Sequence, residues 1–311
     1  MVTSSVLVEN KRGSLRGGIA RAGTVRGPSR TCSFTYPGPL RHESINCFSE
    51  WFPNSVPFQE PESGKGRRFS LRGIEWEGGP PPVPIFIMFK DRVSVLMETL
   101  RSFWRTMRTP YEIVIMNDNS TYPDATAFLQ KLREAGVTVH DNDRAWTTFD
   151  ELYKINADFV ASYMATHTSE YYVLTDPDCA LESAPWNILF VYQAVLDGLG
   201  LEAVGASLRW DDFPETMSAP YEAAMLKLQA NAFEMNGRHY YYIDAPVDTT
   251  FAMYRKGHKL QRLRGKYVRM LPPLGARHLD FYLEKGKLPP DYSYYRSSAR
   301  AKNVNHMQHL E

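Results

Sequence analysis

The chain has 311 residues, of which 43% are hydrophobic and 13% aromatic, so it is long enough to bury a substantial core. Its longest apolar runs have the length of a strand, well short of the roughly 18 residues of a transmembrane helix, so no membrane-spanning segment is predicted. The formal net charge is +1, and the residues after position 80 are slightly acidic, which argues against nucleic-acid binding as the main function.

The three cysteines, Cys32, Cys47 and Cys179, have neither metal-ligand spacing nor the even number of a disulfide framework. Such cysteine usage is typical of a reducing compartment, and we expect a cytoplasmic protein.

Residues 1–80 differ in composition from the rest of the chain. They carry 11 Lys or Arg against 7 Asp or Glu, and "KRGSLRGGIARAGTVRGPSR" is rich in Gly, Arg and Ser without periodicity. This composition buries too little apolar surface to offset chain entropy, so a disordered region or tail of unknown role is predicted. An organelle transit peptide and a start placed too far upstream stay open as alternatives.

From Val83 on, strand and helix patterns alternate. The apolar runs predict buried strands at 83–89, 111–117, 137–140 and 170–176, and amphipathic periodicity predicts helices at 91–107, 122–136 and 148–164. Strands that alternate with helices of this length form parallel βαβ units. The prediction is an α/β fold with a mixed, mostly parallel central sheet and helices on both faces.

After Asp178 the pattern changes. The segments 202–210, 240–255 and 266–271 predict later and partly antiparallel strands. We therefore expect one domain over residues 81–290, followed by a C-terminal tail at 291–311.

Acidic and amide side chains follow two of the predicted strands. The strand 111–117 leads into "NDNS" with Asp118, and "YYVLTDPDCAL" ends its apolar run in Asp176 and Asp178. In parallel sheets, ligands bind at the carboxyl ends of the strands, and carboxylates suit Mg²⁺ or Mn²⁺. The alternative is that Asp176 only ends the strand and Asp178 only caps the next element.

The order of six segments resembles a glycosyltransferase of the GT-A fold, in the family 2-like group. Over residues 83–287, the resemblance rests on "VPIFIMFKDRVSVLMETLRSFWR", "EIVIMNDNSTYP", "YYVLTDPDCAL", "VGASLRWDDFPE", "PVDTTFAMYRKG" and "ARHLDFYL". It implies transfer of a sugar from a nucleotide-diphosphate sugar to a hydroxyl acceptor. Departures are "NDNS" after the second strand, where two acids and a glycine are common, and Val247–Asp248, where a Glu–Asp pair is usual.

The resemblance implies roles for individual residues. Asp176, Asp178 and His278 are expected to hold Mn²⁺ or Mg²⁺ beside the donor diphosphate, with His278 contacting either the metal or the diphosphate. Asp248 is expected to be the general base of an inverting reaction. Without the resemblance, His278 is typical of a solvated residue at a helix start, and Asp248 of a helix N-cap.

The remaining candidates concern the substrates. Asp118 is expected to contact the nucleotide, although an Asx-turn explains it equally well. Arg144 and Trp146 are candidates for the donor pocket, or are structural. Asp211 and Asp212, which follow Trp210, suit the acceptor sugar or a solvated loop.

Two other functions stay open. A domain that binds a nucleotide sugar without turnover is possible, because the late motif keeps a single acid. A phosphatase of the haloacid-dehalogenase type also uses a D-x-D pair, but on its first strand, followed by Thr or Val. Here Cys179 follows a pair that comes after three earlier predicted strands.

Overall fold

The computed structural model describes residues 56–58, 67–144, 146–182, 184–209, 228–258, 265–283 and 286–298. All of these residues belong to one unit of the chain, residues 35–311. Among them, twelve strands form one sheet in the order β1–β2–β3–β5–β4–β7–β12–β9–β13–β11–β10, with β6 paired to β5. A short antiparallel pair, β8 (Cys179–Ala180) and β14 (Arg277–His278), lies beside this sheet.

The centre of the sheet is parallel. Its strands β6, β5, β4 and β7 pair in parallel register, and their bounds are Thr138–Asp141, Tyr111–Asn117, Val83–Phe89 and Tyr171–Thr175. Next to β7 lie β12, which is antiparallel to both neighbours, then β9 and β13, with bounds Ala252–Arg255, Ala203–Ala206 and Tyr267–Met270. The predicted mixed, mostly parallel sheet is therefore confirmed.

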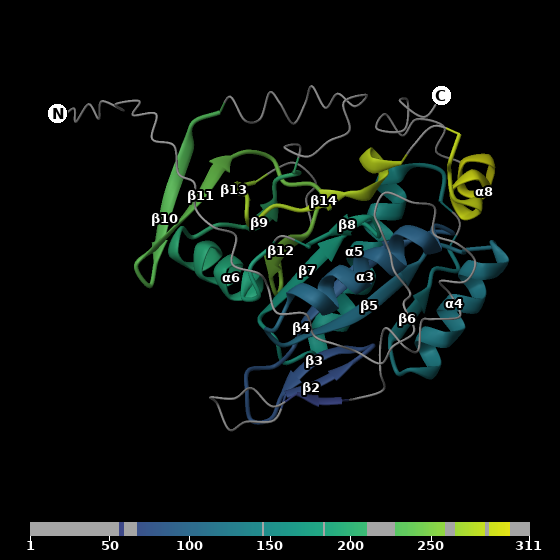
Figure 1. Ribbon diagram of the computed structural model, residues 1–311, viewed down its shortest axis with the longest axis horizontal. Coiled ribbons are helices and arrows are strands. Elements are labelled where there is room, and N and C mark those ends of the chain that lie inside the picture. The colour runs from purple at the N-terminus through teal and green to yellow at the C-terminus, as the bar shows by residue number, and fades with distance from the viewer. Residues whose placement is uncertain are drawn as a thin grey trace, which may run out of the picture. The chain divides into compact units, whose positions relative to one another are not determined.

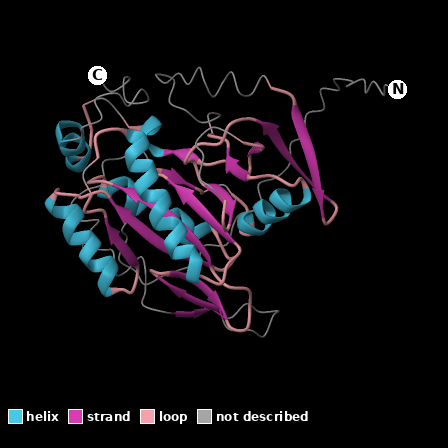
Figure 2. Cartoon of the chain, turned by 180° about the vertical axis from the view of Figure 1, so that it is seen from behind, coloured by secondary structure: helices cyan, strands magenta, loops and turns pink. Residues whose placement is uncertain are grey.

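Helices cover both faces of this sheet (Figures 1 and 2). On one face the core joins strand residues to three helices: α3 (Val93–Thr106), α4 (Pro123–Glu134) and α6 (Ile188–Gly198). On the other face, Val160 and Met164 of α5 (Phe149–Thr166) pack on Phe86 and Met116. Side chains alternate between the faces along each strand, so a fully apolar strand such as β4 serves both cores.

The segment 240–255, predicted as one strand region, forms two strands that are not neighbours. β11 (Arg238–Asp244) pairs with β10 (Ala230–Met235) and β13, whereas β12 lies between β7 and β9. The break contains Pro246, which lacks the N–H that a strand ladder uses. It ends at Phe251, whose φ of 51° is incompatible with an extended strand.

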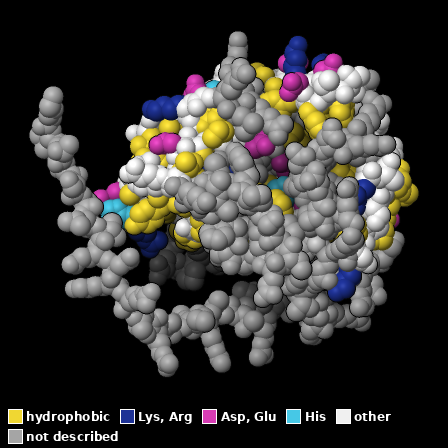
Figure 3. All heavy atoms as spheres, turned by 90° about the horizontal axis from the view of Figure 1, so that it is seen from above, with side chains coloured by type: hydrophobic (Ala, Val, Ile, Leu, Met, Phe, Trp, Pro, Cys, Tyr) yellow, Lys and Arg dark blue, Asp and Glu magenta, His cyan; other side chains and the backbone are white. Residues whose placement is uncertain are grey.

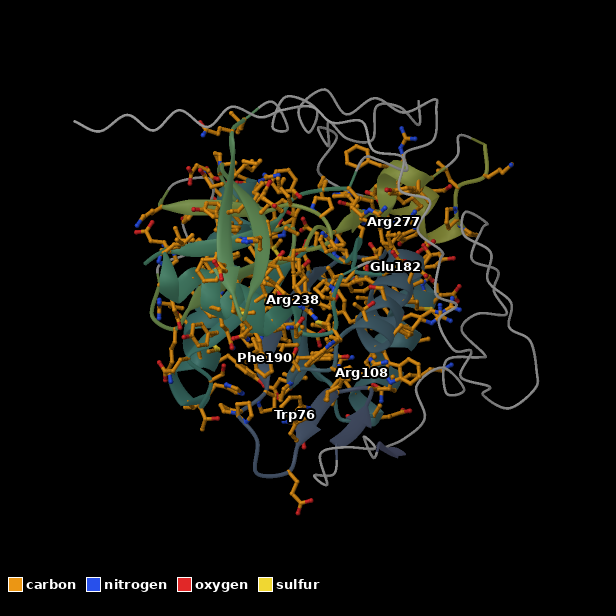
Figure 4. The ribbon with its side chains drawn as sticks, turned by 60° about the vertical axis from the view of Figure 1, so that its left-hand side comes forward. Trp76, Arg108, Glu182, Phe190, Arg238 and Arg277 are labelled. Carbon is orange, nitrogen blue, oxygen red and sulfur yellow. The ribbon has the colours of Figure 1, made fainter. Side chains whose placement is uncertain are left out.

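Secondary structure is present on both outer sides of the predicted domain, residues 81–290. Strands β1 (Val56–Phe58), β2 (Arg67–Ser70) and β3 (Gly73–Trp76) lie inside the region predicted as a tail, and β3 pairs with β5. Trp76 donates through Nε1 to the Arg108 carbonyl at 3.1 Å, and its ring lies 5.8 Å from that of Phe190 (Figure 4). These strands are too short and alternate too little to predict. β3 is stabilised by pairing with β5, β2 by pairing with β3, and β1 by pairing with β2.

The predicted C-terminal tail likewise begins inside the domain. Helix α8 (Pro290–Ser298) buries Tyr292 completely, and Asp291 accepts a hydrogen bond of 2.7 Å from the backbone N–H of Ser94. Ser94 lies in the first turn of α3, where backbone N–H groups lack helical partners. The domain thus extends to α8. Within the described part of the chain, no helix is both long enough and apolar enough to cross a membrane.

Candidate functional site

Four neighbouring strand ends meet at one edge of the sheet. The parallel strands β5, β4 and β7 lead there into Asp118, Lys90 and Asp176, and β12, which runs the opposite way, begins there after Asp248. With neighbouring strands about 4.8 Å apart, the row extends over about 14 Å. On the face seen from above in Figure 3, acidic side chains lie near the centre beside a histidine. The edge thus suits an extended ligand better than a lone ion.

Of the two acids of the D-x-D pair, Asp178 is the more deeply buried, with 1% of its surface exposed. Its Oδ2 accepts a hydrogen bond of 2.8 Å from the guanidinium of Arg92, and its backbone carbonyl accepts from the N–H of Leu279 at 2.7 Å. Its Oδ1 is buried and has no hydrogen-bond partner among the described residues. An ionised carboxylate oxygen left in this state is costly, so Asp178 needs a further explanation.

His278 and Asp280 approach Asp178 from the end of the chain. The pairing of β14 with β8 places His278 opposite Cys179, and the imidazole Nδ1 lies 3.7 Å from Asp178 Oδ2. Asp280 follows in a 3₁₀ turn (Leu279–Tyr282) and is fully buried. The structure thus brings His278 and Asp178 together, and His278 is buried rather than solvated.

Arg277, the residue before His278, contacts different side chains. Arg277 lies 3.9 Å from Glu182 in an ion pair (Figure 4). Its guanidinium carbon is 4.7 Å from the ring centroid of Tyr282. These contacts fix the strand β14, which carries His278.

The guanidinium of Arg92 connects Asp178 to Asp280. Its NH1 donates to Asp280 Oδ2 at 2.6 Å as well as to Asp178. Burial opposes the charge on Arg92, but Asp280 and Asp178 hold the pKa of the guanidinium well above its usual range. One cation therefore already neutralises part of this cluster.

Asp176 and Thr249 are hydrogen-bonded to each other where β7 ends and β12 begins. Thr249 donates to Asp176 Oδ2 at 2.6 Å, and the backbone N–H of Asp176 donates to the Thr249 carbonyl at 2.9 Å. Burial raises the pKa of Asp176 to about 7, and the negative charges of Asp178 and Asp248 add to the rise. Such carboxylates hold a bound cation readily, because the cation removes their mutual repulsion.

The turn that carries Asp248 has unusual backbone geometry. Phe251 has a φ of 51° although it is bulky, and it is fully buried between the rings of Phe103 and Tyr192. Asp248 itself is half-buried and accepts a hydrogen bond of 2.9 Å from the N–H of Thr249. Such a conformation persists only where packing determines it, as occurs at functional sites.

Among the described residues, two groups of side chains bring possible metal-ligand atoms within 4.8 Å of one another: Asp176, Asp178 and Cys179, and Asp178, His278 and Asp280. In the second group, Arg92 already contacts both carboxylates. In the first group, burial keeps the pKa of the Cys179 thiol well above its usual range, so the thiol is protonated and a poor ligand. Asp176 with Oδ1 of Asp178 therefore fits a hard divalent cation best, since such ions are held by one or two carboxylates plus substrate phosphates.

Asp118 forms the other end of the row. It is 9% exposed, and its Oδ1 accepts hydrogen bonds from Trp146 Nε1 at 2.7 Å and from Asn142 at 3.3 Å. Lys90 donates to the Asp118 carbonyl at 2.8 Å, with its Nζ 3.9 Å from Oδ2. The structure thus brings Asp118 and Trp146 together and adds two residues that the sequence did not suggest.

Arg144 lies farther out, with a side chain that is 63% exposed and 3.8 Å from Asp158. Together with Trp146 it lines a cavity of about 380 Å³, whose other wall is formed by α5 through Glu151, Lys154 and Asp158. This cavity adjoins Asp118 through Trp146 and does not include the acids of the D-x-D pair. Asp211 and Asp212, the predicted acceptor contacts, lie outside the described residues.

Sequence patterns missed four residues of the site: Lys90, Arg92, Asn142 and Asp280. Lys90 and Arg92 occur in "FKDRVS", where the predicted strand 83–89 ends and the predicted helix 91–107 begins, and their position at a strand end is a usable signal. Asp280 follows His278 by two residues in "RHLDF". Only the fold shows that it meets Arg92, because 188 residues separate the two.

No family model matches the chain, and no curated protein matches it. Several solved structures match with probability 1.00. One is the mannosyltransferase PcManGT from Pyrobaculum calidifontis in complex with GDP-Man and Mn²⁺, at 12% identity and a TM-score of 0.41, covering 86% of this chain and 78% of that one. Another is S. aureus TarS 1–349 in complex with UDP-GlcNAc, at 16% identity and a TM-score of 0.37, covering 56% of this chain and 45% of that one.

A third is glucosyl-3-phosphoglycerate synthase from Mycobacterium tuberculosis in complex with Mn²⁺ and uridine-diphosphate-glucose, at 12% identity and a TM-score of 0.32, covering 57% and 56% of the two chains. The chain spans 47% of one TarS 1–349 structure and 28% of another TarS structure. All three of these structures are complexes with a nucleotide sugar, and two of them also contain Mn²⁺. Because these TM-scores are below 0.5, the activity of this protein has to be inferred from its own site.

Proposed function

We propose that the protein is a GT-A glycosyltransferase that moves a sugar from a nucleotide-diphosphate sugar to a hydroxyl acceptor and depends on a divalent cation. The observation that carries this proposal is Asp178, a carboxylate at 1% exposure with one oxygen that no described residue hydrogen-bonds. A fold keeps such a group at the carboxyl edge of its sheet when a ligand completes it. The order of the six sequence segments supports the same class.

Asp178 and Asp176 are the residues that would hold Mn²⁺ or Mg²⁺. When bound, the ion supplies positive charge that offsets the charge developing on the leaving diphosphate. His278, 3.7 Å from Asp178, is proposed as a third protein contact, to the ion or to the diphosphate. Thr249 keeps Asp176 in place through its hydrogen bond.

Asp248 is the proposed general base. It removes the proton of the acceptor hydroxyl as that oxygen forms a bond to the anomeric carbon and the bond to the diphosphate breaks. Attack from the side opposite the leaving group inverts the configuration at that carbon. Thr249, the residue after Asp248, donates a hydrogen bond of 2.6 Å to Asp176, and this placement supports the role, because a base has to lie within reach of the reacting centre.

Asp118 and Trp146 are proposed to bind the nucleotide, with Arg144 at the outer end of the same cavity. An aromatic ring beside a carboxylate offers a surface for a base and an acceptor for its N–H or ribose hydroxyl groups. Asp211 and Asp212 remain our candidates for binding the acceptor.

The two other functions are less well supported. The D-x-D pair follows β7, after β4, β5 and β6, which does not match the first-strand position of a dehalogenase-type phosphatase. Binding of a nucleotide sugar without turnover would use the same site. It differs from the proposed function only in that Asp248 does not act as a general base.

A thermal-shift assay of the full chain with MnCl₂ and either UDP or GDP tests the proposal. We expect Mn²⁺ together with one of the nucleotides to raise Tm, because a ligand that binds the folded state stabilises it by linkage. Asp178→Ala should lose the part of the Tm increase that depends on Mn²⁺. Glu134→Ala, which removes an exposed acid on α4, should keep it. The proposal fails when folded wild-type protein shows no shift with any nucleoside diphosphate. Release of nucleoside diphosphate from a donor then separates turnover from binding.

A further inference from the structure

Arg92 is a cation built into the acidic cluster. Its NH1 lies 2.8 Å from Asp178 Oδ2 and 2.6 Å from Asp280 Oδ2. Arg92 is 9% exposed, Asp178 1% and Asp280 0%, so water screens these charges little. Two carboxylates this close to a common point repel each other strongly unless a cation lies between them.

The backbone next to Arg92 is fixed from the side of α4. Asp91 has a φ of 56°, and its Oδ1 accepts hydrogen bonds from the N–H groups of Thr121 at 2.6 Å and Tyr122 at 2.8 Å. Its own N–H donates to Ser120 at 2.9 Å. The turn that carries Arg92 is therefore tied to the end of β5 and the start of α4.

The side chain of Arg92 is held from the side of α8. The ring centroid of Tyr295 lies 4.9 Å from the guanidinium carbon, a cation–π distance. Asp291 accepts a hydrogen bond from the N–H of Ser94, two residues after Arg92, and the next residue of α8, Tyr292, is fully buried. With the backbone and the guanidinium both held, Arg92 cannot turn out to solvent without breaking the packing of α8.

We infer that Arg92 is a positioning residue that serves as a resident cation, occupying the place between Asp178 and Asp280 and leaving Asp178 Oδ1 to a single divalent ion on the Asp176 side. The inference rests on the proposed function, which supplies the divalent ion. It goes further by stating that the site accepts one such ion. Asp178, His278 and Asp280 lie within 4.8 Å of one another and would form a second cation position if the guanidinium were removed. Arg92 closes that position.

The first test removes the charge in the full chain with Arg92→Met and measures Tm and calorimetric Mn²⁺ stoichiometry with MnCl₂ alone. Loss of one partner of a buried ion pair is strongly destabilising, so we expect a metal-free Tm about 10 °C lower than that of the wild type. Mn²⁺ should raise the Tm of the variant by more than it raises that of the wild type, and a second Mn²⁺ should bind. Equal Mn²⁺ shifts and equal stoichiometry in the two proteins would overturn the inference.

Two matched variants separate this role from simple packing. Arg101→Met removes a buried arginine within α3, which is paired with Glu98 at 3.3 Å and lies about two and a half turns away from Arg92. It should lower Tm without any additional Mn²⁺ shift. Arg92→Lys keeps the charge and should still bind one Mn²⁺. An enlarged Mn²⁺ shift in Arg101→Met would contradict a specific role for Arg92.

The second test needs no metal. In metal-free buffer, the double variant Arg92→Met/Asp280→Asn should be more stable than Arg92→Met alone, because it no longer buries an uncompensated carboxylate beside Asp178. A double variant that is less stable than Arg92→Met refutes the resident cation. If Mn²⁺ with nucleotide leaves wild-type Tm unchanged, the proposed function fails, and this metal-free comparison still decides the role of Arg92.

Discussion

Two buried carboxylates at opposite edges of the sheet differ in how completely their oxygens are hydrogen-bonded. Glu112, at the amino end of β5, is 4% exposed and accepts from Arg72 at 2.9 Å and Tyr163 at 2.8 Å, with His167 Nε2 at 3.0 Å. Both of its oxygens have partners. Asp178, at the carboxyl edge, has partners for one oxygen and none among the described residues for the other.

The difference separates a structural carboxylate from a candidate ligand. A fully hydrogen-bonded buried network specifies how elements pack, and here it ties β5, α5 and the residues before β4 together. A buried charge with an incomplete set of partners costs stability, and active sites are where proteins keep such groups. Substitutions at the two sites should therefore change different quantities.

The largest expected effect is on activity, at Asp178. Asp178→Asn keeps the shape of the side chain but removes the charge on Oδ1, so we expect kcat/KM for transfer to fall about 1,000-fold. Tm should change little, because Arg92 keeps its pair with Asp280. Initial rates at saturating Mn²⁺ and circular-dichroism melts measure the two effects. Near-normal turnover in folded Asp178→Asn would remove Asp178 from the site.

Asp248→Asn should have the next largest effect. A general base typically contributes 10²- to 10⁴-fold, so kcat should fall by about 100-fold or more, while the shift in Tm with Mn²⁺ and nucleotide stays. Steady-state rates with saturating donor, together with the thermal-shift assay, measure both quantities. Normal turnover would assign the base elsewhere, and loss of the nucleotide shift would instead make Asp248 a binding residue.

The sequence predicted the centre of the fold well, because the apolar period of strands and helices is set by burial. Val83–Phe89 and Tyr111–Asn117 agree residue for residue with β4 and β5. It failed where local pattern is weak: β3 is four residues long, and α8 mixes Tyr, Ser and Asp without a clear apolar face. Both elements are stabilised by contacts with distant parts of the chain.

The candidate site was predicted only in part for the same reason. Acids at strand ends, such as Asp118 and Asp178, are visible in a sequence because their position follows from the strand. Which side chains contact each other is not visible in the sequence. Arg92 and Asp280, for example, are 188 positions apart, and only the fold brings them together. That His278 is buried likewise follows from the pairing of β14 with β8, two strands too short to predict.

At the other edge, Glu112→Gln should reduce stability and leave activity alone. It weakens charge-assisted hydrogen bonds to Arg72 and Tyr163, each worth about 1.5–3 kcal/mol, and half-exposed Arg72 can regain water. We expect a loss of about 2 kcal/mol in the free energy of unfolding, measured by urea denaturation. The activity per folded molecule should equal that of the wild type. A large fall in kcat with unchanged stability would reverse the contrast between the two edges.

The smallest expected effect concerns His140, at the outer end of the α5 interface that also contains Tyr163. Its ring stacks on Phe159 with centroids 3.8 Å apart and an angle of 4° between planes. Burial lowers the pKa of His140, and Asp141 and Asp143 oppose this shift only partly. The folded state therefore favours the neutral ring more than the unfolded state does.

The sign of the pH dependence follows from this pKa. The contribution of His140 to stability is fully present above its unfolded pKa of about 6.5, and it is lost as pH falls from there through the lower folded value. His140→Phe keeps the stacked ring and removes the proton site, so its Tm should fall slightly less than that of the wild type between pH 8 and pH 5. The pH profile of sugar transfer should be the same in both proteins, because the ring of His140 is stacked on Phe159 of α5. An altered activity profile would instead connect the α5 interface to the candidate site through Asp141, which follows His140 and accepts a hydrogen bond from Asn117, next to Asp118.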